Sequence, residues 1–307
     1  MQDLSAPDPN TPIGIVGLGL VGHALAQRLQ SAGYRCIGSD VRPDAMARFE
    51  AQGHSIQASV AQLATIAPVC ILAVFDTHDV MDVVGQIQAQ RSPSDPALTL
   101  IDCSTGDPIL LQTLAASLKA EGIAFVEAPL SGSSAQIEQG QATLLLGGEA
   151  SDITRLNPIL EVMAEQRIYV GAAGMAARAK LATNLVLGLN RAALAEGMVF
   201  AEAMGIAPDH FLQLVLATPA RSDAAVVKGQ MMVQGQFEPQ SRIRQHFKDV
   251  QLMLSMAGVQ QQNLPLSQTH AALMKAAMEA GDGELDNAAI IRQIRRDKHR
   301  PGGNHGS

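Results

Sequence analysis

Residues 13 to 22 constrain the fold more than any other part of the chain. They read Ile-Gly-Ile-Val-Gly-Leu-Gly-Leu-Val-Gly, and a helical pattern follows from His23 to Gln30. In a strand–turn–helix of this kind, Gly17 permits the tight turn, Gly19 lets the backbone approach a pyrophosphate, and Gly22 lets the helix pack close to the sheet. Free N–H groups at the helix start then point at the anion. The segment predicts a Rossmann-type dinucleotide site, and a glycine-rich turn without a ligand is the alternative.

An acidic residue follows the next predicted strand. Asp40 comes directly after residues 35–39 and lies 18 residues beyond Gly22. A carboxylate at this position accepts hydrogen bonds from the adenine ribose hydroxyls of NAD and repels the 2′-phosphate of NADP. Arg42, two residues further on, can offset that repulsion. We therefore expect NAD as the cofactor, with NADP as the less favoured alternative.

The sequence pattern changes near residue 170. Up to there, short apolar or β-branched runs alternate with segments of helical period, as in βαβ units on a parallel sheet. After Gly171 the strand signals stop and helical segments follow, and 307 residues exceed what one core usually organises. We predict an α/β, doubly wound domain over residues 1–170 and an all-α domain over residues 171–307, with disordered ends at 1–11 and 298–307. The predicted strands span residues 13–16, 35–39, 69–74, 99–101, 124–126, 143–146 and 167–170, and the predicted helices of the second domain span residues 175–204, 208–216, 222–233, 243–257, 266–280 and 287–296.

The first helix of the second domain is unusually long and apolar. Residues 175–204 carry Leu, Ala and Phe on more than one helical face. A helix of this kind is predicted to be buried on several sides. It is also a plausible subunit interface, so we expect a homodimer or homotetramer.

Composition narrows the class of partner. The formal net charge is −7, and 47% of residues are hydrophobic against 17% charged. This favours a globular enzyme with a small-molecule substrate over a protein that binds nucleic acid or an anionic membrane. No segment resembles a signal peptide or a membrane span, so a cytoplasmic location is expected. Cys36, Cys70 and Cys103 lie in apolar runs without paired spacing, which predicts buried thiols and no metal site.

A lysine and an asparagine stand out in the long helix. Lys180 and Asn184 are four residues apart in an otherwise apolar segment, so they share one helical face. Together they can address one small polar ligand, and burial would lower the pKa of the lysine toward neutrality. The alternative is a lysine that reaches solvent beside a solvent-facing asparagine.

Five segments together resemble the β-hydroxyacid dehydrogenase family, which includes 3-hydroxyisobutyrate, tartronate semialdehyde and threonate dehydrogenases. The glycine turn resembles the N-terminal signature of the family, and the Lys180 segment resembles its G-x-x-G-x-x-x-x-x-K-x-x-x-N. The other three are residues 102–108 (Asp-Cys-Ser-Thr-Gly-Asp-Pro), 125–133 (Phe-Val-Glu-Ala-Pro-Leu-Ser-Gly-Ser) and 237–249 (Phe-Glu-Pro-Gln-Ser-Arg-Ile-Arg-Gln-His-Phe-Lys-Asp). Their order and spacing over residues 12–297 are similar to those of the family.

The resemblance implies a hydride-transfer enzyme that interconverts a short 3-hydroxy acid and its semialdehyde or keto acid. It implies that Lys180 is the catalytic lysine, that Ser131, Gly132 and Asn184 contact the substrate, and that Lys248 lies near the nicotinamide or substrate. It also favours Ser104 and Thr105 as cofactor contacts over their alternative role as helix caps. The predicted cofactor-binding residues are thus Gly17, Leu18, Gly19, Leu20, Val21, Gly22, Asp40, Val41, Arg42, Ser104, Thr105 and Lys248.

Chemistry supports the same roles. A 3-hydroxy acid needs a cradle for its carboxylate and a proton-transfer group at a fixed separation. Backbone N–H groups and hydroxyls of Ser131, Gly132 and Ser133 can form the cradle, and Lys180 can transfer the proton as general acid or base. Lys248 with Asp249 can equally be a solvated pair on a helix, and His246 has no assigned role.

Several positions depart from the family pattern. Val21 replaces a methionine, Glu127 replaces an aspartate, and Ser133 replaces a glycine of the substrate loop. The chain also has no tryptophan near residues 218–224, which suggests a small, hydroxylated or doubly charged acid, with Arg221 assisting a second anionic group. The alternatives are an imine reductase-like enzyme and a non-catalytic dinucleotide sensor or scaffold.

Overall fold

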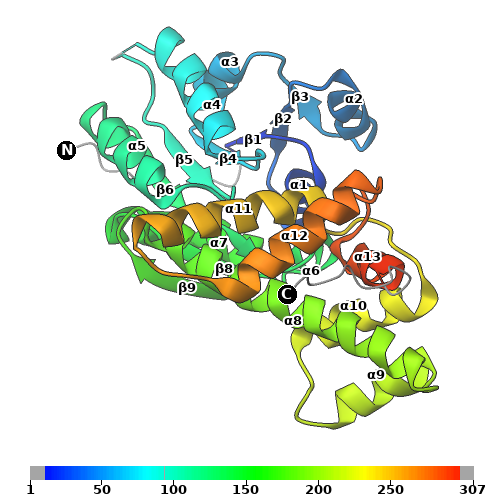
Figure 1. The fold of residues 1–307 in the computed structure, drawn as a ribbon. Coiled ribbons are helices and arrows are strands. Elements are labelled where there is room, and N and C mark those ends of the chain that lie inside the picture. The colour runs from blue at the N-terminus through cyan, green and yellow to red at the C-terminus, as the bar shows by residue number, and fades with distance from the viewer. Residues whose placement is uncertain (1–10, 93, 298–307) are drawn as a thin grey trace. The chain divides into compact units, whose positions relative to one another are not determined.

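The computed structural model describes residues 11–92 and 94–297, and the predicted disordered ends lie outside these residues except at Thr11. The chain divides into two compact units, residues 1–180 and 181–307 (Figure 1). The boundary thus falls inside a helix, ten residues beyond the position at which the sequence pattern changes. The elements of the first unit are β1 (Ile13–Val16), α1 (Leu20–Ser31), β2 (Cys36–Ser39), α2 (Pro43–Ala51), β3 (Ser55–Ile56), α3 (Val60–Ile66), β4 (Val69–Leu72), α4 (Thr77–Gln90), β5 (Thr99–Asp102), α5 (Pro108–Ala120), β6 (Ala124–Glu127), β7 (Leu130–Ser131), α6 (Ser134–Glu138), β8 (Thr143–Gly147), α7 (Ala150–Met163), β9 (Gln166–Gly171) and the start of α8 (Met175–Ala203).

The first unit is a doubly wound sheet, as predicted. Its strand order is β3-β2-β1-β4-β5-β6-β8-β7, with β9 paired to β8, and the strands from β3 to β6 are parallel. Side chains of α1 and α7 pack on one face of the sheet, and side chains of α3, α4 and α5 pack on the other. Strands covered on both faces need nearly continuous apolar runs, and β1, β2 and β4 are buried at every residue. The order of the first six strands places the glycine turn where the chain direction around the sheet reverses.

The sheet departs from the predicted parallel arrangement at β8. This strand runs antiparallel to both β6 and β7. A parallel crossover needs a dozen or more residues, whereas only residues 132–142, with the five-residue helix α6, connect β7 to β8. The two-residue strands β3 and β7 were not predicted, because two residues are too short to show a periodic pattern.

The second unit consists of helices, and their bounds agree with the predicted ranges within two residues. They are the rest of α8, α9 (Pro208–Ala217), α10 (Asp223–Gln234), α11 (Ile243–Val259), α12 (Pro265–Glu279), the 3-10 turn η1 (Asn287–Ala289) and α13 (Ile290–Asp297). The prediction that α8 is buried on several sides is wrong for the single chain. Its buried residues form one stripe that includes Gly188, Ala195 and Met198, while Val186 and Phe200 are 57% and 64% exposed. The remaining helices of the unit therefore cover only one face of α8.

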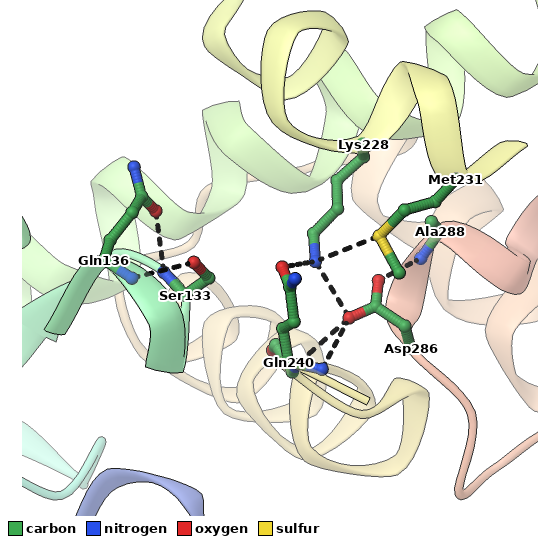
Figure 2. A network of polar contacts seen from close by, with 8 residues as sticks. Ser133, Gln136, Lys228, Met231, Gln240, Asp286 and Ala288 are labelled. Carbon is green, nitrogen blue, oxygen red and sulfur yellow. Dashed lines mark hydrogen bonds and ion pairs between the residues drawn. The ribbon is translucent and has the colours of Figure 1, made fainter. Parts of the chain in front are cut away.

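A buried carboxylate joins three segments of the second unit. Asp286 is 0% exposed and accepts hydrogen bonds from Lys228 Nζ at 2.8 Å and from the backbone N–H groups of Gln240, Ser241 and Ala288 at 2.9 to 3.1 Å (Figure 2). Burial lowers the pKa of Lys228, and the charge of Asp286 opposes that effect. Four donors around one carboxylate compensate its loss of water, so the pair fixes α10 against the turn before α11 and against η1.

The three cysteines are free and buried, which confirms the prediction of core thiols. Burial raises the pKa of Cys36 and Cys70 to about 12, so these thiols are not nucleophiles at neutral pH. Within the described ranges, no helix has the length and apolar character needed to cross a bilayer.

Candidate active site

The glycine turn between β1 and α1 has the geometry expected of a pyrophosphate site. Gly17 has φ +91°, and a Cβ added there would lie 2.4 Å from the carbonyl oxygen of Ala73. A Cβ at Gly22 would lie 2.0 Å from the Gly17 carbonyl oxygen, so α1 can approach the turn only with glycine at this position. Around Gly19, by contrast, a Cβ would meet nothing within 4 Å, and among the described residues no side chain caps this start of α1. The open, uncapped helix start fits the phosphates of a dinucleotide.

Asp40 holds the glycine turn from the end of β2. Its Oδ2 accepts a hydrogen bond of 2.7 Å from the Leu18 N–H, and its Oδ1 accepts from the Arg42 N–H at 2.8 Å and from Arg42 Nε at 3.3 Å. Burial alone would raise the pKa of Asp40, but the hydrogen bonds from Arg42 and Leu18 outweigh it and hold the pKa below its ordinary value. Asp40 is therefore a carboxylate at neutral pH. Val41 beside it is 95% exposed.

Ser104 lies just beyond the end of β5, and its hydroxyl is buried. The Ser104 N–H donates to Asp102 Oδ1 at 2.9 Å, while Ser104 Oγ has no hydrogen-bond partner among the described residues. The side chain that caps α5 is that of Asp107, which accepts from the N–H groups of Ile109 and Leu110. The helix-cap alternative for Ser104 and Thr105 is thus wrong. A buried hydroxyl without a partner is a group that a ligand can satisfy.

The segment Ser131–Ser133 forms a turn between β7 and α6. Gly132 has φ +156°, and a Cβ added there would lie 2.9 Å from the Cβ of Ala142, so glycine is required. Ser133 caps α6: its Oγ accepts from the Gln136 N–H at 3.3 Å, and its own N–H donates to Gln136 Oε1 at 2.8 Å (Figure 2). The backbone N–H of Ser133 therefore already has a hydrogen-bond acceptor inside the turn. The predicted anion cradle must be formed by the other donors of residues 131–133.

Lys180 lies beside this turn within the first unit. It is 6% exposed, and its Nζ donates a hydrogen bond of 2.6 Å to the carbonyl oxygen of Leu130, the residue before Ser131. The alternative of a lysine that reaches solvent is therefore wrong. The structure brings Lys180 and the predicted substrate loop together, as the sequence predicted.

Asn184 follows one turn later on α8 and belongs to the second unit. It is 6% exposed, and its Nδ2 donates to Asp249 Oδ2 at 3.2 Å. Lys248 Nζ lies 3.2 Å from Asp249 Oδ1, with side-chain exposures of 19% for the lysine and 7% for the aspartate. The alternative of a solvated Lys248–Asp249 pair is wrong. Arg221 lies in the exposed loop between α9 and α10.

His246, which had no assigned role, is a packing residue in the second unit. It is 5% exposed, and a Cβ added at Gly188 would lie 2.3 Å from its Nε2. Its ring lies 5.4 Å from that of His270. His246 thus packs α11 against the glycine of α8.

The sequence did not reveal the partners that hold these side chains. Leu130 acts through its carbonyl oxygen, which no side-chain pattern can indicate. Asp249 was visible only as the neighbour of Lys248. Glu127 was noted only as a departure from the family pattern, although a charged residue at the end of a buried strand is itself a signal.

Comparison with known families agrees with this geometry. The model of the NAD binding domain of 6-phosphogluconate dehydrogenase matches residues 12–171, and that of the NAD-binding domain of NADP-dependent 3-hydroxyisobutyrate dehydrogenase matches residues 174–294. The chain belongs to the β-hydroxyacid dehydrogenase family. The chain accordingly has the NAD-binding domains of an oxidoreductase of this family.

Individual relatives match nearly the whole length of this chain. It is 26% identical to 2-hydroxy-3-oxopropionate reductase of Escherichia coli over 92% of this chain and 96% of that protein. It is 27% identical to L-threonate dehydrogenase of Cupriavidus necator over 91% and 95%. The crystal structure of 3-hydroxyisobutyrate dehydrogenase from Salmonella typhimurium has a TM-score of 0.82 and 28% identity, covering 92% of this chain and 99% of that one.

Proposed function

We propose that the protein is an NAD-linked dehydrogenase or reductase that interconverts a short 3-hydroxy acid and its semialdehyde or keto acid, with Lys180 as general acid and base. One observation carries the proposal. The Lys180 ammonium is buried and lies 2.6 Å from the Leu130 carbonyl, directly before the Ser131–Gly132 turn. An amine that is shielded from water and fixed beside an anion-binding turn is suited to proton transfer at a substrate oxygen.

The chain supplies proton transfer and orientation. An ammonium has three donors, so Lys180 can keep its bond to Leu130 and still donate to a substrate carbonyl or alkoxide. In the oxidation direction the neutral amine takes the hydroxyl proton. Asn184, one turn further along α8, orients the same substrate oxygen, and Ser131 and Gly132 bind the carboxylate with Ser133 restricted to its hydroxyl. Hydride transfer is the chemistry that a nicotinamide would supply when bound at the glycine turn.

NAD is favoured over NADP by the charges around Asp40. The carboxylate carries a full negative charge, and its bond to Arg42 neutralises the cation that a 2′-phosphate would need. A ribose with two free hydroxyls suits a carboxylate acceptor, and the two long contacts from the Arg42 side chain, of 3.3 Å to Oδ1 and 3.5 Å to Oδ2, are the ones that ribose hydroxyls can replace. Ser104 Oγ, Thr105 and Lys248 are proposed as further contacts of the cofactor.

The substrate class is tested with a panel of acids. Purified protein is mixed with 3-hydroxyisobutyrate, glycerate, L-threonate or tartronate semialdehyde, and NADH or NADPH absorbance is followed. We expect turnover of at least one of these acids with NAD(H) preferred. Absence of turnover with all four and both cofactors would count against the proposed reaction.

We also propose that the enzyme works as a homodimer or homotetramer. Apolar side chains of the second unit lie exposed along α8 and α9, with Phe200 at 64%, Met204 at 58% and Leu214 at 45%. These three side chains border one surface hollow, and contiguous exposed apolar patches commonly mark protein–protein interfaces. Light scattering should give a mass of at least two chains for the wild type and a smaller mass for Phe200→Glu. The control is Ile66→Glu, at an exposed apolar residue of the first unit, which should have the wild-type mass. A monomeric wild type would exclude the assembly.

A further inference from the structure

Glu127 binds the first turn of α8 from inside the first unit. It is the last residue of β6 and is 1% exposed. Its two carboxylate oxygens accept hydrogen bonds from the N–H of Gly174 and, at 3.2 Å, from the N–H of Ala177, and the N–H of Ala176 contributes as well. These N–H groups have no partners within a helix, because they precede its first complete turn. A carboxylate at this position also matches the partial positive charge of the helix start.

A second contact ties the same helix to the same segment. Lys180, three residues after Ala177, donates to the carbonyl oxygen of Leu130, three residues after Glu127. Residues three apart lie on one face of a helix, about 4.5 Å apart along its axis. The short segment 127–130 therefore holds α8 at two points, once through the Glu127 side chain and once through a backbone carbonyl, directly before the Ser131–Gly132 turn.

We propose that Glu127 is a positioning residue for Lys180: its carboxylate fixes the first turn of α8 on the end of β6 and thereby sets the position of the lysine ammonium relative to the substrate turn. This role rests on the proposed function of Lys180. Glu127 itself does not touch the reacting atoms. It acts through the backbone of the helix that carries the lysine.

The Glu127 carboxylate lies close to the backbone of β8. Gly147 on β8 pairs with Glu127, and a Cβ added there would lie 2.7 Å from Glu127 Oε2 and 3.0 Å from the Cβ of Ala176. A residue with a Cβ at position 147 would therefore collide with the carboxylate, so glycine provides the room that Glu127 needs beside the helix. Burial raises the pKa of Glu127, while the backbone hydrogen bonds and the charge of Arg178 oppose it. Asp102, its register neighbour on β5, is a second acidic group beside it.

The departure from the family pattern has a physical meaning in this arrangement. The family has aspartate where this chain has Glu127, and the additional methylene extends the reach of the carboxylate. Shortening the side chain keeps the charge but withdraws the oxygens from the helix. Glu127→Gln has the opposite effect, because it keeps the reach but places an NH₂ group against N–H donors of the helix.

The test compares Glu127→Gln, Glu127→Asp and Glu149→Gln in the full-length protein. Glu149 is a matched control, since it lies at the N-cap of α7 but has an exposed side chain. kcat and KM are measured with the acid of the panel that the wild type turns over, as a function of pH. NADH binding is measured by fluorescence and folding by thermal unfolding. We expect Glu127→Gln to lower kcat about 10- to 100-fold, the range for small misplacements of a catalytic group, with NADH affinity within about twofold of wild type.

Glu127→Asp should have a higher kcat than Glu127→Gln, because it keeps the charge. The apparent pKa in the pH profile of kcat should differ from wild type in Glu127→Gln and should equal the wild-type value in Glu149→Gln. A loss of thermal stability with unchanged kcat and unchanged pH profile in the Gln and Asp variants would show a purely structural cap and overturn the proposal. If Glu127→Gln does not fold, the Asp variant decides on the same two readouts.

Combination with Lys180→Ala separates the inference from the function on which it rests. If Glu127 acts through Lys180, Glu127→Gln should lower kcat much less in the Lys180→Ala background than in the wild type. Equal losses in both backgrounds would overturn the positioning role. A Lys180→Ala variant with wild-type turnover would instead refute the proposed function, whatever Glu127 does.

Discussion

Asn184 on α8 donates a hydrogen bond of 3.2 Å to Asp249 on α11, and the other oxygen of the same carboxylate lies 3.2 Å from Lys248 Nζ. One buried carboxylate of the second unit thus contacts two of the side chains that the family resemblance assigns to the substrate and the cofactor. Because hydrogen bonds to a charged group are stronger than neutral ones, Asp249 restricts the orientation of both.

Asp249→Asn should therefore weaken catalysis without unfolding the protein. The variant keeps the shape but loses the charge that holds Lys248 and one acceptor for the Asn184 amide. A charge-assisted bond is worth about 1.5 to 3 kcal/mol, so we expect kcat/KM to fall about 10- to 100-fold in the absorbance assay. Asp209→Asn, at an exposed aspartate of α9, is the control. Equal kcat/KM for Asp249→Asn and wild type would remove Asp249 from the site.

Lys180 gives the most direct test of the mechanism. Lys180→Ala should lower kcat about 10²- to 10⁴-fold, the usual contribution of a positioned acid–base group. Lys180→Arg should also be impaired, because a guanidinium can donate to Leu130 but does not release its proton at neutral pH. NADH binding, measured by fluorescence, should persist in both variants, since the glycine turn and Asp40 are unchanged. Near wild-type turnover of the Ala variant, with Lys275→Ala as the exposed control, would exclude Lys180 from proton transfer.

Asp40 should determine cofactor preference. Asp40→Ser removes the charge that repels a 2′-phosphate and releases Arg42 to pair with that phosphate. The ratio of kcat/KM with NADPH to kcat/KM with NADH should therefore rise about tenfold or more, which corresponds to about 1.4 kcal/mol. The same change removes the acceptor of the Leu18 N–H, so the affinity for NADH should also fall. Asp40→Asn separates the two effects, because the amide oxygen can still accept from Leu18. An unchanged ratio in both variants would show that Asp40 does not contact the ribose.

The sequence predicted those parts of the molecule that depend on local patterns. The strand of Ile13–Val16, its glycine turn and the long helix with Lys180 follow from residue spacing alone, because steric demand at Gly17 and helical periodicity act over a few residues. The antiparallel β8 was not predictable in this way, since its direction depends on the length of a connection and not on its own residues. The same limit applies to Glu127 and Asp249, whose partners lie 47 and 65 residues away along the chain.

Sequence position also gave no indication of the buried histidines of the second unit. His270 on α12 is 4% exposed, and burial lowers its pKa from 6.5 to about 4, with the charge of Arg191 acting in the same direction. The unfolded chain therefore binds a proton between pH 6.5 and about 4, whereas the folded chain leaves His270 neutral in that interval. The free energy of unfolding must then fall as pH decreases through this window and level off below about 4.

Replacing His270 with a residue that does not titrate should remove this part of the acid sensitivity. The free energy of unfolding is measured by urea denaturation at pH 7 and at pH 4.5. Its decrease over this interval should be about 2 to 3 kcal/mol larger for the wild type than for His270→Gln. The comparison uses the change with pH within each variant, so a constant packing cost of the substitution cancels. His78→Gln, at a side chain that is 84% exposed, should follow the wild type. If His270→Gln loses as much stability on acidification as the wild type, His270 is not a neutral buried group in the folded protein.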